Sequence, residues 1–248
     1  MSTATPAETV RAAAQAMHTI GTTMMVDPKT AERGASWGWN DPFAFYFAGR
    51  GGVLGDSEPD VITAAFGWFH PGVVAQKWKA GISVDGARGA ASRYNEAVAL
   101  WGRDNLAGAQ GLDRIVELGE RLINGAEGSG LPLFAGWRSE PRVTDAPGQA
   151  MQVMFVLREW RGAIHLAATT AVGLSPVEAI LTNEGEGQAK FFGWPEPFAD
   201  VTQLKNLHEK AEATTDQRCG EVQARILSPA ENTEFAELVT AAQQLAAS

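Results

Sequence analysis

The sequence predicts a mainly α-helical protein made of two helical halves that an internal pseudo-two-fold duplication relates. The first observation is a pattern that occurs twice: a histidine, a Thr-Thr pair four residues later, a proline ten or eleven residues after the histidine, and an aromatic run after 27 or 26 residues. The second is that helix-type spacing outweighs strand signals along the chain. The matched residues are His18, Thr22, Thr23, Pro28 and Phe45 in one copy, and His165, Thr169, Thr170, Pro176 and Phe191 in the other.

A chance match is the alternative to duplication, because alanine and threonine are frequent and the register drifts by one residue between proline and aromatics. If the duplication holds, the halves pack about a pseudo-dyad, and His18 and His165 occupy equivalent places near it. A chain of 248 residues is long enough for one large domain or two small ones. The stretch 141–148 has the character of a linker, which gives halves at residues 1–140 and 149–248.

Helix signals can be followed through the first half. A helix is expected over 6–17, with Thr5 as N-cap and Pro6 at the first helical position, and it runs directly into His18. Turn signals and aromatic residues then lead to the glycine-rich stretch 50–55. Further helices are expected over residues 57–69, 73–78, 85–101 and 112–123, and a short apolar segment follows at 131–137.

The second half begins with a long helix expected over 149–171. A shorter helix opens at Ser175 and Pro176, and a loop with embedded aromatic residues covers 185–197. Val222 to Leu227 could form a short strand of a wing-like hairpin. The fold class is therefore two winged-helix-like halves with few short β-strands. The last two helices are expected over residues 201–219 and 232–247.

Charge and composition narrow the classes of function. The net charge is −9, with 20 basic against 29 acidic residues and no basic cluster, which disfavours nucleic acid as a partner. The single cysteine, Cys219, excludes an internal disulfide and a multi-cysteine metal cage. The most apolar stretch, 151–174, carries four charged or titratable residues, so no membrane span is expected. Without a secretory signal at the start, the expected location is the cytoplasm.

A polar stripe on the helix over 149–171 carries the sharpest chemistry. Arg158, Arg161, Gly162 and His165 share one face by their spacing, while the flanking runs are apolar nearly all round and indicate a buried helix. Buried arginines need partners, and either Glu159 or an anionic ligand could serve. The alternative is a solvated face with simple Arg–Glu pairing.

The two histidines are candidates for general acid-base catalysis, because imidazole titrates near neutrality and adjacent arginines would lower its pKa. No spacing pattern makes His18 and His165 metal ligands, so no metal is expected. The stretch that starts at Arg50 lacks the Gly-Lys-Ser/Thr ending of a phosphate loop. A tight turn that presents Arg50 toward the aromatic residues is the favoured interpretation.

Three motifs carry a resemblance to a known family: residues 47–55, the Phe-x-x-Phe-x-Pro motif within 64–74, and Leu-Arg-Glu-x-Arg-Gly-x-x-His within 157–167. Together they resemble the actinobacterial SalK-like helix-turn-helix family. The departures are Val53 in place of proline, His70 in place of a small polar residue, and Trp160 in place of histidine. The family implies no settled reaction. The residues that the resemblance points to are His18, Arg50, Phe66, Phe69, Pro71, Arg158, Glu159, Arg161, Gly162 and His165.

Two functions follow from this site, and the cofactor stays unknown. In the first, the protein binds a small anionic or aromatic molecule, as a binding protein or an enzyme, in a pocket between the halves. Its catalytic candidates are His18 and His165, and its ligand-binding candidates are Arg50, Phe66, Phe69, Arg158, Glu159 and Arg161. In the second, the pocket is the effector site of a winged-helix regulator, although the helix over 201–219 balances its basic residues with acids. A structural partner protein without a pocket is a third alternative, and monomer and homodimer remain equally open.

Overall fold

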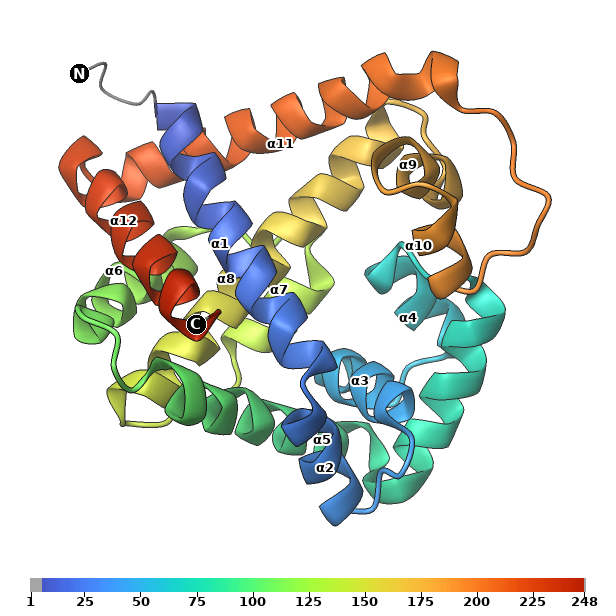
Figure 1. Ribbon diagram of the computed structural model, residues 1–248, viewed down its shortest axis with the longest axis horizontal. Helices are drawn as coiled ribbons and strands as arrows, with labels where there is room; N and C mark the ends of the chain where they lie inside the picture. The colour runs from blue at the N-terminus through green and yellow to red at the C-terminus, as the bar shows by residue number, and fades with distance from the viewer. Residues whose placement is uncertain (1–5, 248) are drawn as a thin grey trace.

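The computed structural model describes residues 6–247, and these contain twelve α-helices, two 3-10 helices and no β-strand (Figure 1). Helix therefore dominates, as the sequence predicts. The α-helices are α1 (Pro6–Val26), α2 (Pro28–Ser36), α3 (Pro42–Gly51), α4 (Pro59–Phe66), α5 (Pro71–Leu106), α6 (Leu112–Gly125), α7 (Pro132–Arg138), α8 (Ala146–Ala171), α9 (Pro176–Asn183), α10 (Glu186–Phe191), α11 (Lys205–Ile226) and α12 (Pro229–Ala246). The 3-10 helices are η1 (Gly52–Leu54) and η2 (Thr202–Leu204).

Proline sets where most helices begin. Nine helices carry proline at one of their first two positions, where the missing N–H costs nothing and the fixed φ suits the helix. Side-chain caps fix several of the same starts. Asp27, Asp41 and Asp145 accept from backbone N–H groups of the first turns of α2, α3 and α8. Ser175 and Ser228 form complete capping boxes at α9 and α12.

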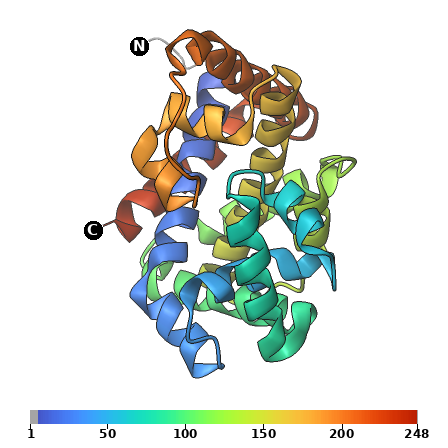
Figure 2. The ribbon, with the colours of Figure 1, turned by 90° about the vertical axis from the view of Figure 1, so that its right-hand side faces the viewer.

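Helix α8 is the centre of the packing. It contacts α1, α5, α6, α7 and α11, and from Gly148 to Leu157 every residue except the half-buried Gln149 is buried. Figure 2, turned by 90°, shows α1 and α7 on opposite sides of it. The second half of α8, from Arg158 to Leu166, is mostly half-buried. This half leaves the core and borders the candidate site.

Two glycines allow α5 to cross its neighbours closely. A Cβ added at Gly81 would collide with the carbonyl oxygen of Ala44 in α3, and one at Gly102 would collide with the carbonyl oxygen of Pro147 at the start of α8. These crossings hold α3 and α8 against the same long helix. They thereby bring Arg50 of α3 and Glu159 of α8 within reach of each other.

The expected strand at 222–227 is wrong. Val222 to Ile226 form the last turns of α11, Leu227 is extended at the C-cap, and Ser228 already caps α12. Cys219, Val222 and Ile226 follow helical spacing and pack against other elements, so helical periodicity prevails over the β-propensity of the branched residues. No wing is therefore formed by these residues.

Several element boundaries also differ from the expected ones. Helix α1 runs through His18 to Val26, and α5 joins the two helices expected over 73–78 and 85–101 across a kink at Asp85 and Gly86. The expected aromatic loop over 185–197 contains α10. Only residues 141–145 of the linker predicted over 141–148 are non-helical, because residues 146–148 already belong to α8.

The internal duplication stays a prediction. Helices α2 and α9 both start at the matched prolines, but the aromatic run lies inside α3 and at the end of α10. The tripeptide Phe-Gly-Trp occurs at 66–68 and again at 192–194, and both of its glycines are left-handed, with φ of 77° and 84°. The two turns touch, because Trp194 Nε1 donates to the carbonyl oxygen of Trp68 at 2.8 Å. The spacing from histidine to this tripeptide differs, 48 residues from His18 but 27 from His165.

Among residues 6–247, no single helix is long and apolar enough to cross a membrane. Helices α8 and α9 are long and apolar enough for a membrane span only when they are taken together, and the chain bends by 105° at the break between them.

Candidate functional site

A buried carboxylate, Glu159, organises the polar interior between α3 and α8. Its side chain is 1% exposed. Arg50 binds it with two hydrogen bonds, from Nε to Oε1 at 2.9 Å and from Nη2 to Oε2 at 2.8 Å. Arg158 adds a third, from Nη1 to Oε1 at 3.0 Å. Burial acts to raise the pKa of Glu159, but Arg50 and then Arg158 outweigh it, so this pKa is lowered and the group is ionised.

Arg50 is held at one edge and on one face of its guanidinium group. Its Nη1 donates to the hydroxyl oxygen of Tyr46 at 3.1 Å, one turn earlier on α3. Its Cζ lies 4.3 Å from the centre of the Phe66 ring, a cation–π contact. These contacts fix the arginine in place and give it a structural role toward Glu159. Arg50 faces aromatic residues as expected, but it lies in the last turn of helix α3 and not in a tight turn.

Arg158 has only a single hydrogen bond to Glu159 and keeps 17% of its side chain exposed. The side chain of Arg158 crosses α1 at Gly21, where an added Cβ would collide with Arg158 Cδ. Its Nε is buried and has no hydrogen-bond partner. Within the part of the chain that the structure describes, Glu159 is the one carboxylate paired with either Arg50 or Arg158. Two largely buried cations therefore share one anion.

Arg161 leaves this group and joins α8 to α11. Its Nη2 donates to Glu212 at 2.9 Å and to Asp216 at 3.0 Å. Asp216 is buried and also accepts from Arg11 Nε of α1 at 2.7 Å. The charges of these four residues balance. Arg161 is thus a structural tie among three helices and offers no excess charge to a ligand.

His165 lies between this tie and the aromatic residues. Its Nδ1 is 3.1 Å from Thr215 Oγ1, and because that hydroxyl donates to the Ala211 carbonyl oxygen, Nδ1 is the protonated nitrogen. Its Nε2 is 3.4 Å from Glu212 Oε1, and its ring is 5.6 Å from that of Trp68. Burial lowers the pKa of His165, and Glu212 opposes this shift.

His18 faces α8 from the middle of α1 and remains open to solvent. Desolvation by the surrounding protein, then Arg158 and then Arg161, lower the pKa of His18 to about 4. The imidazole is therefore neutral near pH 7 and can both donate and accept a hydrogen bond.

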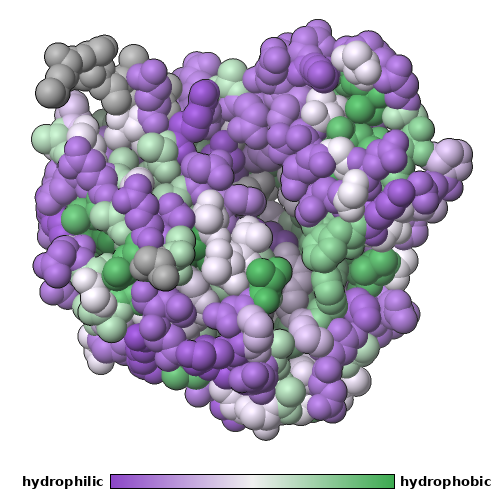
Figure 3. All heavy atoms as spheres, viewed as in Figure 1, coloured by the Kyte–Doolittle hydropathy of each residue, from purple (hydrophilic) through white to green (hydrophobic). Residues whose placement is uncertain are grey.

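Figure 3 shows a hollow on this face of the molecule, with α1 and α8 on one side and α10 on the other. Gly162 marks open space beside it, because a Cβ added there would meet no atom within 4 Å. Phe43 of α3 and Phe191 of α10 remain 37% and 53% exposed, and their rings are 5.7 Å apart. The hollow is thus bordered by polar residues along α1 and α8 and by aromatic residues along α3 and α10.

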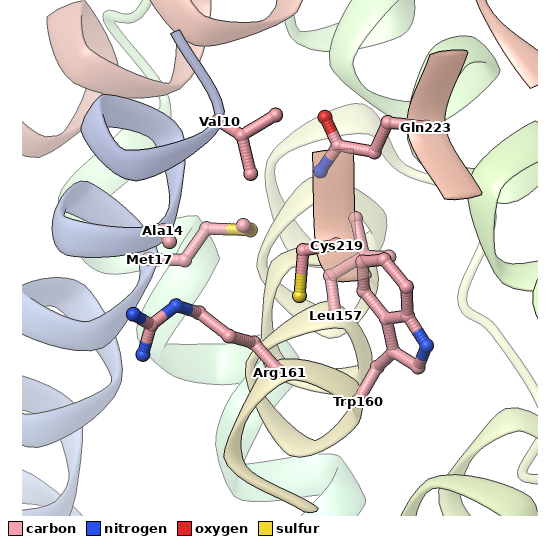
Figure 4. A pocket seen from close by; sticks show the side chains of 8 residues that line it. All are labelled: Val10, Ala14, Met17, Leu157, Trp160, Arg161, Cys219 and Gln223. Carbon is pink, nitrogen blue, oxygen red and sulfur yellow. The ribbon is translucent and has the colours of Figure 1, made fainter. Parts of the chain in front are cut away.

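A small cavity bordered by Arg161 and Cys219 is too small for an organic ligand. It measures about 10 Å³ and lies where α1, α8 and α11 meet (Figure 4). Cys219 borders it, and burial raises the pKa of this thiol to about 12, so the thiol is unreactive near neutral pH. Arg161 contributes its aliphatic stem there.

The structure brings Arg50, Arg158 and Glu159 into contact and sets Arg161 and His165 in a neighbouring cluster. Phe66 and Phe69 are buried in the aromatic core, stacked on or edge-on to Phe47. Phe66 supports the Arg50 guanidinium through its ring face. These two aromatic residues shape the site through Arg50 and Tyr46, and the structure shows them away from the open surface.

Three participants escaped the sequence analysis as site residues: Tyr46, Glu212 and Asp216. Tyr46 could have been found, since it lies four residues before Arg50 on one helix. Asp216 falls on the same buried face of α11 as Ala211 and Cys219, so an acid on an apolar stripe was its signal. No sequence signal paired these acids with Arg161, because the partners are 51 and 55 residues apart.

A protein-family model described as a helix-turn-helix family matches residues 10–248. The match covers nearly the whole chain. The chain belongs to this helix-turn-helix family. No curated protein and no solved structure matches it.

Proposed function

We propose that this protein binds a small organic anion in the hollow between α1, α8 and α10, with Arg158 as the anchoring cation. The observation that carries the proposal is the charge balance at Glu159, where two guanidinium groups share one buried carboxylate. A buried cation without a matching anion is costly, and a bound carboxylate, phosphate or sulfonate would remove that cost.

Neutral hydrogen-bonding groups near Arg158 support the same proposal. His18 is neutral near pH 7 and approaches from α1, and the Tyr46 hydroxyl has accepted from Arg50 but keeps its own proton to donate. An anion that binds here raises the pKa of His18, so its binding takes up protons in mildly acidic solution. His18 and His165 remain the candidates for proton transfer if the bound molecule is turned over.

The test uses a panel of small anions and three variants. Arg158→Met removes the anchor while Glu159 keeps both hydrogen bonds from Arg50, so folding should survive. Gly162→Leu fills the open space beside α8. Arg225→Met removes an exposed arginine of α11 and serves as the matched control. We expect acetate, succinate, benzoate or naphthoate to raise the thermal unfolding midpoint of the wild-type protein and of Arg225→Met. The midpoints of Arg158→Met and Gly162→Leu should not rise.

The two site variants locate the binding. Equal shifts in the wild-type protein and in Arg158→Met would contradict the role of Arg158. Equal shifts in Gly162→Leu would place the binding elsewhere. If none of the anions shifts the midpoint, the proposal fails, and it also fails if native mass spectrometry finds no small anion bound to the protein in the presence of the panel.

A ligand-responsive regulator is the second candidate function, and the family match over residues 10–248 favours it. In that case the hollow would be the effector site, and the SalK-like resemblance of the motifs points the same way. The Arg161 and His165 contacts to α11 would then connect the hollow to the α11–α12 pair. On α11 the exposed basic residues outnumber the exposed acids only by two, Lys205, Lys210, Arg218 and Arg225 against Glu209 and Glu221. Helix α12 carries no Lys or Arg, and the net charge of −9 opposes DNA binding.

Selection of bound sequences from a random duplex pool, followed by gel shift at physiological salt, tests this second candidate. We expect no sequence-selective binding with a Kd below about 1 μM, which is the tight end of the range for non-specific binding. A nanomolar, salt-sensitive and sequence-selective complex that a small anion weakens would establish the regulator instead.

A further inference from the structure

We infer that the anion taken by this hollow is aromatic, a flat ring that bears a carboxylate or sulfonate group. The inference rests on the proposed function and adds the class of ligand. Its basis is the juxtaposition of the unpaired cationic edge of Arg158 with a band of aromatic side chains on the other side of the same hollow, which is open to solvent at Phe43 and Phe191.

The aromatic band is continuous from the surface to the charged group. Phe43 and Phe191 form an exposed pair, and Phe191 contacts Phe192 at a centroid distance of 5.7 Å. Phe192 packs on Phe69 at 4.4 Å, and Phe69 lies 5.9 Å from Tyr46. The band ends at the Tyr46 hydroxyl, which is bonded to Arg50 at 3.1 Å.

The two open rings of this band are the ones that a ligand could cover. A Phe side chain that is 53% exposed on a short helix leaves a large apolar area in water, and a planar ring can cover it in stacked or edge-on geometry. Trp68 adds a half-buried ring beside His165 on the same side. An aliphatic anion would satisfy Arg158 but would gain none of these aromatic contacts.

The position of the anion relative to the ring follows from the same contacts. Arg158 and His18 lie on α8 and α1, while Phe43 and Phe191 lie on α3 and α10. A ligand that spans both sides carries its charge at one end and its ring at the other. This excludes a diffuse polyanion and a neutral hydrocarbon as the preferred ligand.

The experiment compares molecules that differ in one property at a time, by isothermal titration calorimetry. Naphthoate and benzoate are the aromatic anions in two sizes. Decahydronaphthoate and cyclohexanecarboxylate are their saturated counterparts, and naphthamide and benzamide are the neutral ones. We expect at least one aromatic anion to bind about tenfold or more tightly than its saturated and its neutral counterpart.

Two variants and two controls locate the binding. Arg158→Met should weaken it by about tenfold or more, and Phe191→Ala by about fivefold or more. Arg225→Met and Val61→Ala, which change an exposed arginine and an exposed apolar residue elsewhere, should leave it unchanged. Circular dichroism of each variant verifies that the helices are intact.

The results distinguish this inference from the proposed function beneath it. If a saturated anion binds as tightly as its aromatic counterpart and depends on Arg158 but not on Phe191, the aromatic class is wrong and anion binding stands. If the neutral amide binds as tightly as the acid, or if no anion in the panel binds in an Arg158-dependent way, both proposals fail.

Discussion

At the scale of single residues, Glu159 is the group on which the interior of the site depends. Replacing it by Gln keeps the shape of the side chain but leaves Arg50 and Arg158 as buried cations without an anion. We expect Glu159→Gln to lower the free energy of unfolding by about 3 kcal/mol or more in ligand-free protein, measured by urea denaturation.

The matched control for this prediction is Glu96→Gln, which breaks the exposed ion pair between Arg93 and Glu96 on α5. Exposed pairs contribute less than about 1 kcal/mol, so this variant should unfold close to the wild-type midpoint. Similar losses in both variants would show that the carboxylate of Glu159 does not stabilise the fold through its charge.

A second prediction at this scale concerns pH and His18. The pKa of His18 is about 4 in the folded protein, against an ordinary value of 6.5, because desolvation by the surrounding protein and the two arginines of α8 disfavour the charged form. Between these values the unfolded chain binds more protons than the folded one, so stability must fall as the pH drops from about 6.5 to 4. His18→Gln should flatten this dependence in thermal unfolding scans.

The pKa of His165 shifts in the same direction, so part of the slope should persist in His18→Gln and become smaller in the double variant with His165→Gln. The slope that remains near pH 4 comes from carboxylates with lowered pKa, such as Glu159. Glu212 of α11 opposes the shift of both histidines and limits the total effect. A wild-type stability that stays constant from about pH 7 to 4.5 would contradict the prediction.

The sequence predicted which residues carry the chemistry of the site better than it predicted which side chains they contact. The spacing on the 149–171 helix correctly indicated a buried face that carries charge, and it named Glu159 or an anion as the partner of the arginines. The decisive partner, Arg50, is 109 residues away from Glu159. Only the helix crossings bring them together, and those crossings leave no local signal.

At the scale of elements, the close crossings predict opposite effects of the same substitution. Gly102→Ala adds a methyl group that collides with the Pro147 carbonyl oxygen at the α5–α8 crossing. We expect a loss of about 1–3 kcal/mol, in spite of the better helix propensity of alanine. Gly187→Ala in α10 meets no atom within 4 Å and should be neutral or stabilising by up to about 1 kcal/mol.

Chemical denaturation of the two variants, side by side, measures this difference. If Gly102→Ala were as stable as Gly187→Ala, the two helices could separate slightly at no cost, and glycine would not determine their distance. A rise in stability for both variants would contradict the close packing of α5 against α8.

Helix starts were predictable because proline and capping side chains act within one turn. Ser175 and Pro176 mark α9 in the sequence as clearly as in the structure. Helix α2 begins at Pro28, in a stretch where turns were expected. The wing at 222–227 was not formed, because the branched residues there also fit helical spacing and packing decided between the two. Short apolar runs of this kind are ambiguous until their neighbours are known.

At the scale of the whole molecule, helix-rich character and an open polar face of α8 followed from composition and periodicity. The arrangement of helices around the hollow did not, because it depends on which faces meet. The recurring Phe-Gly-Trp turns illustrate this. They are visible in the sequence, but their contact at Trp68 and Trp194 appears only in three dimensions.

The division of the chain into 1–140 and 149–248 gives the last prediction. Helix α8 of the second half packs against α5, α6 and α7 of the first, and α1 packs against α11 and α12. Without α8, the buried rings of Phe134 and Trp137, which contact Trp160 and Phe155, would face water. We therefore expect each fragment alone to lack cooperative thermal unfolding and dispersed amide NMR signals.

Together, co-expressed fragments of residues 1–140 and 141–248 should assemble into a complex with native-like unfolding. A cut after residue 140 lies between α7 and α8 and breaks neither helix, whereas a fragment that starts at residue 149 lacks the N-terminal end of α8. The intact protein nicked in that segment is the control, and it should remain associated. A fragment of residues 149–248 that folds cooperatively by itself would show instead that the halves are independent domains. That result would also strengthen the case for an ancestral duplication, because each copy would then carry its own core.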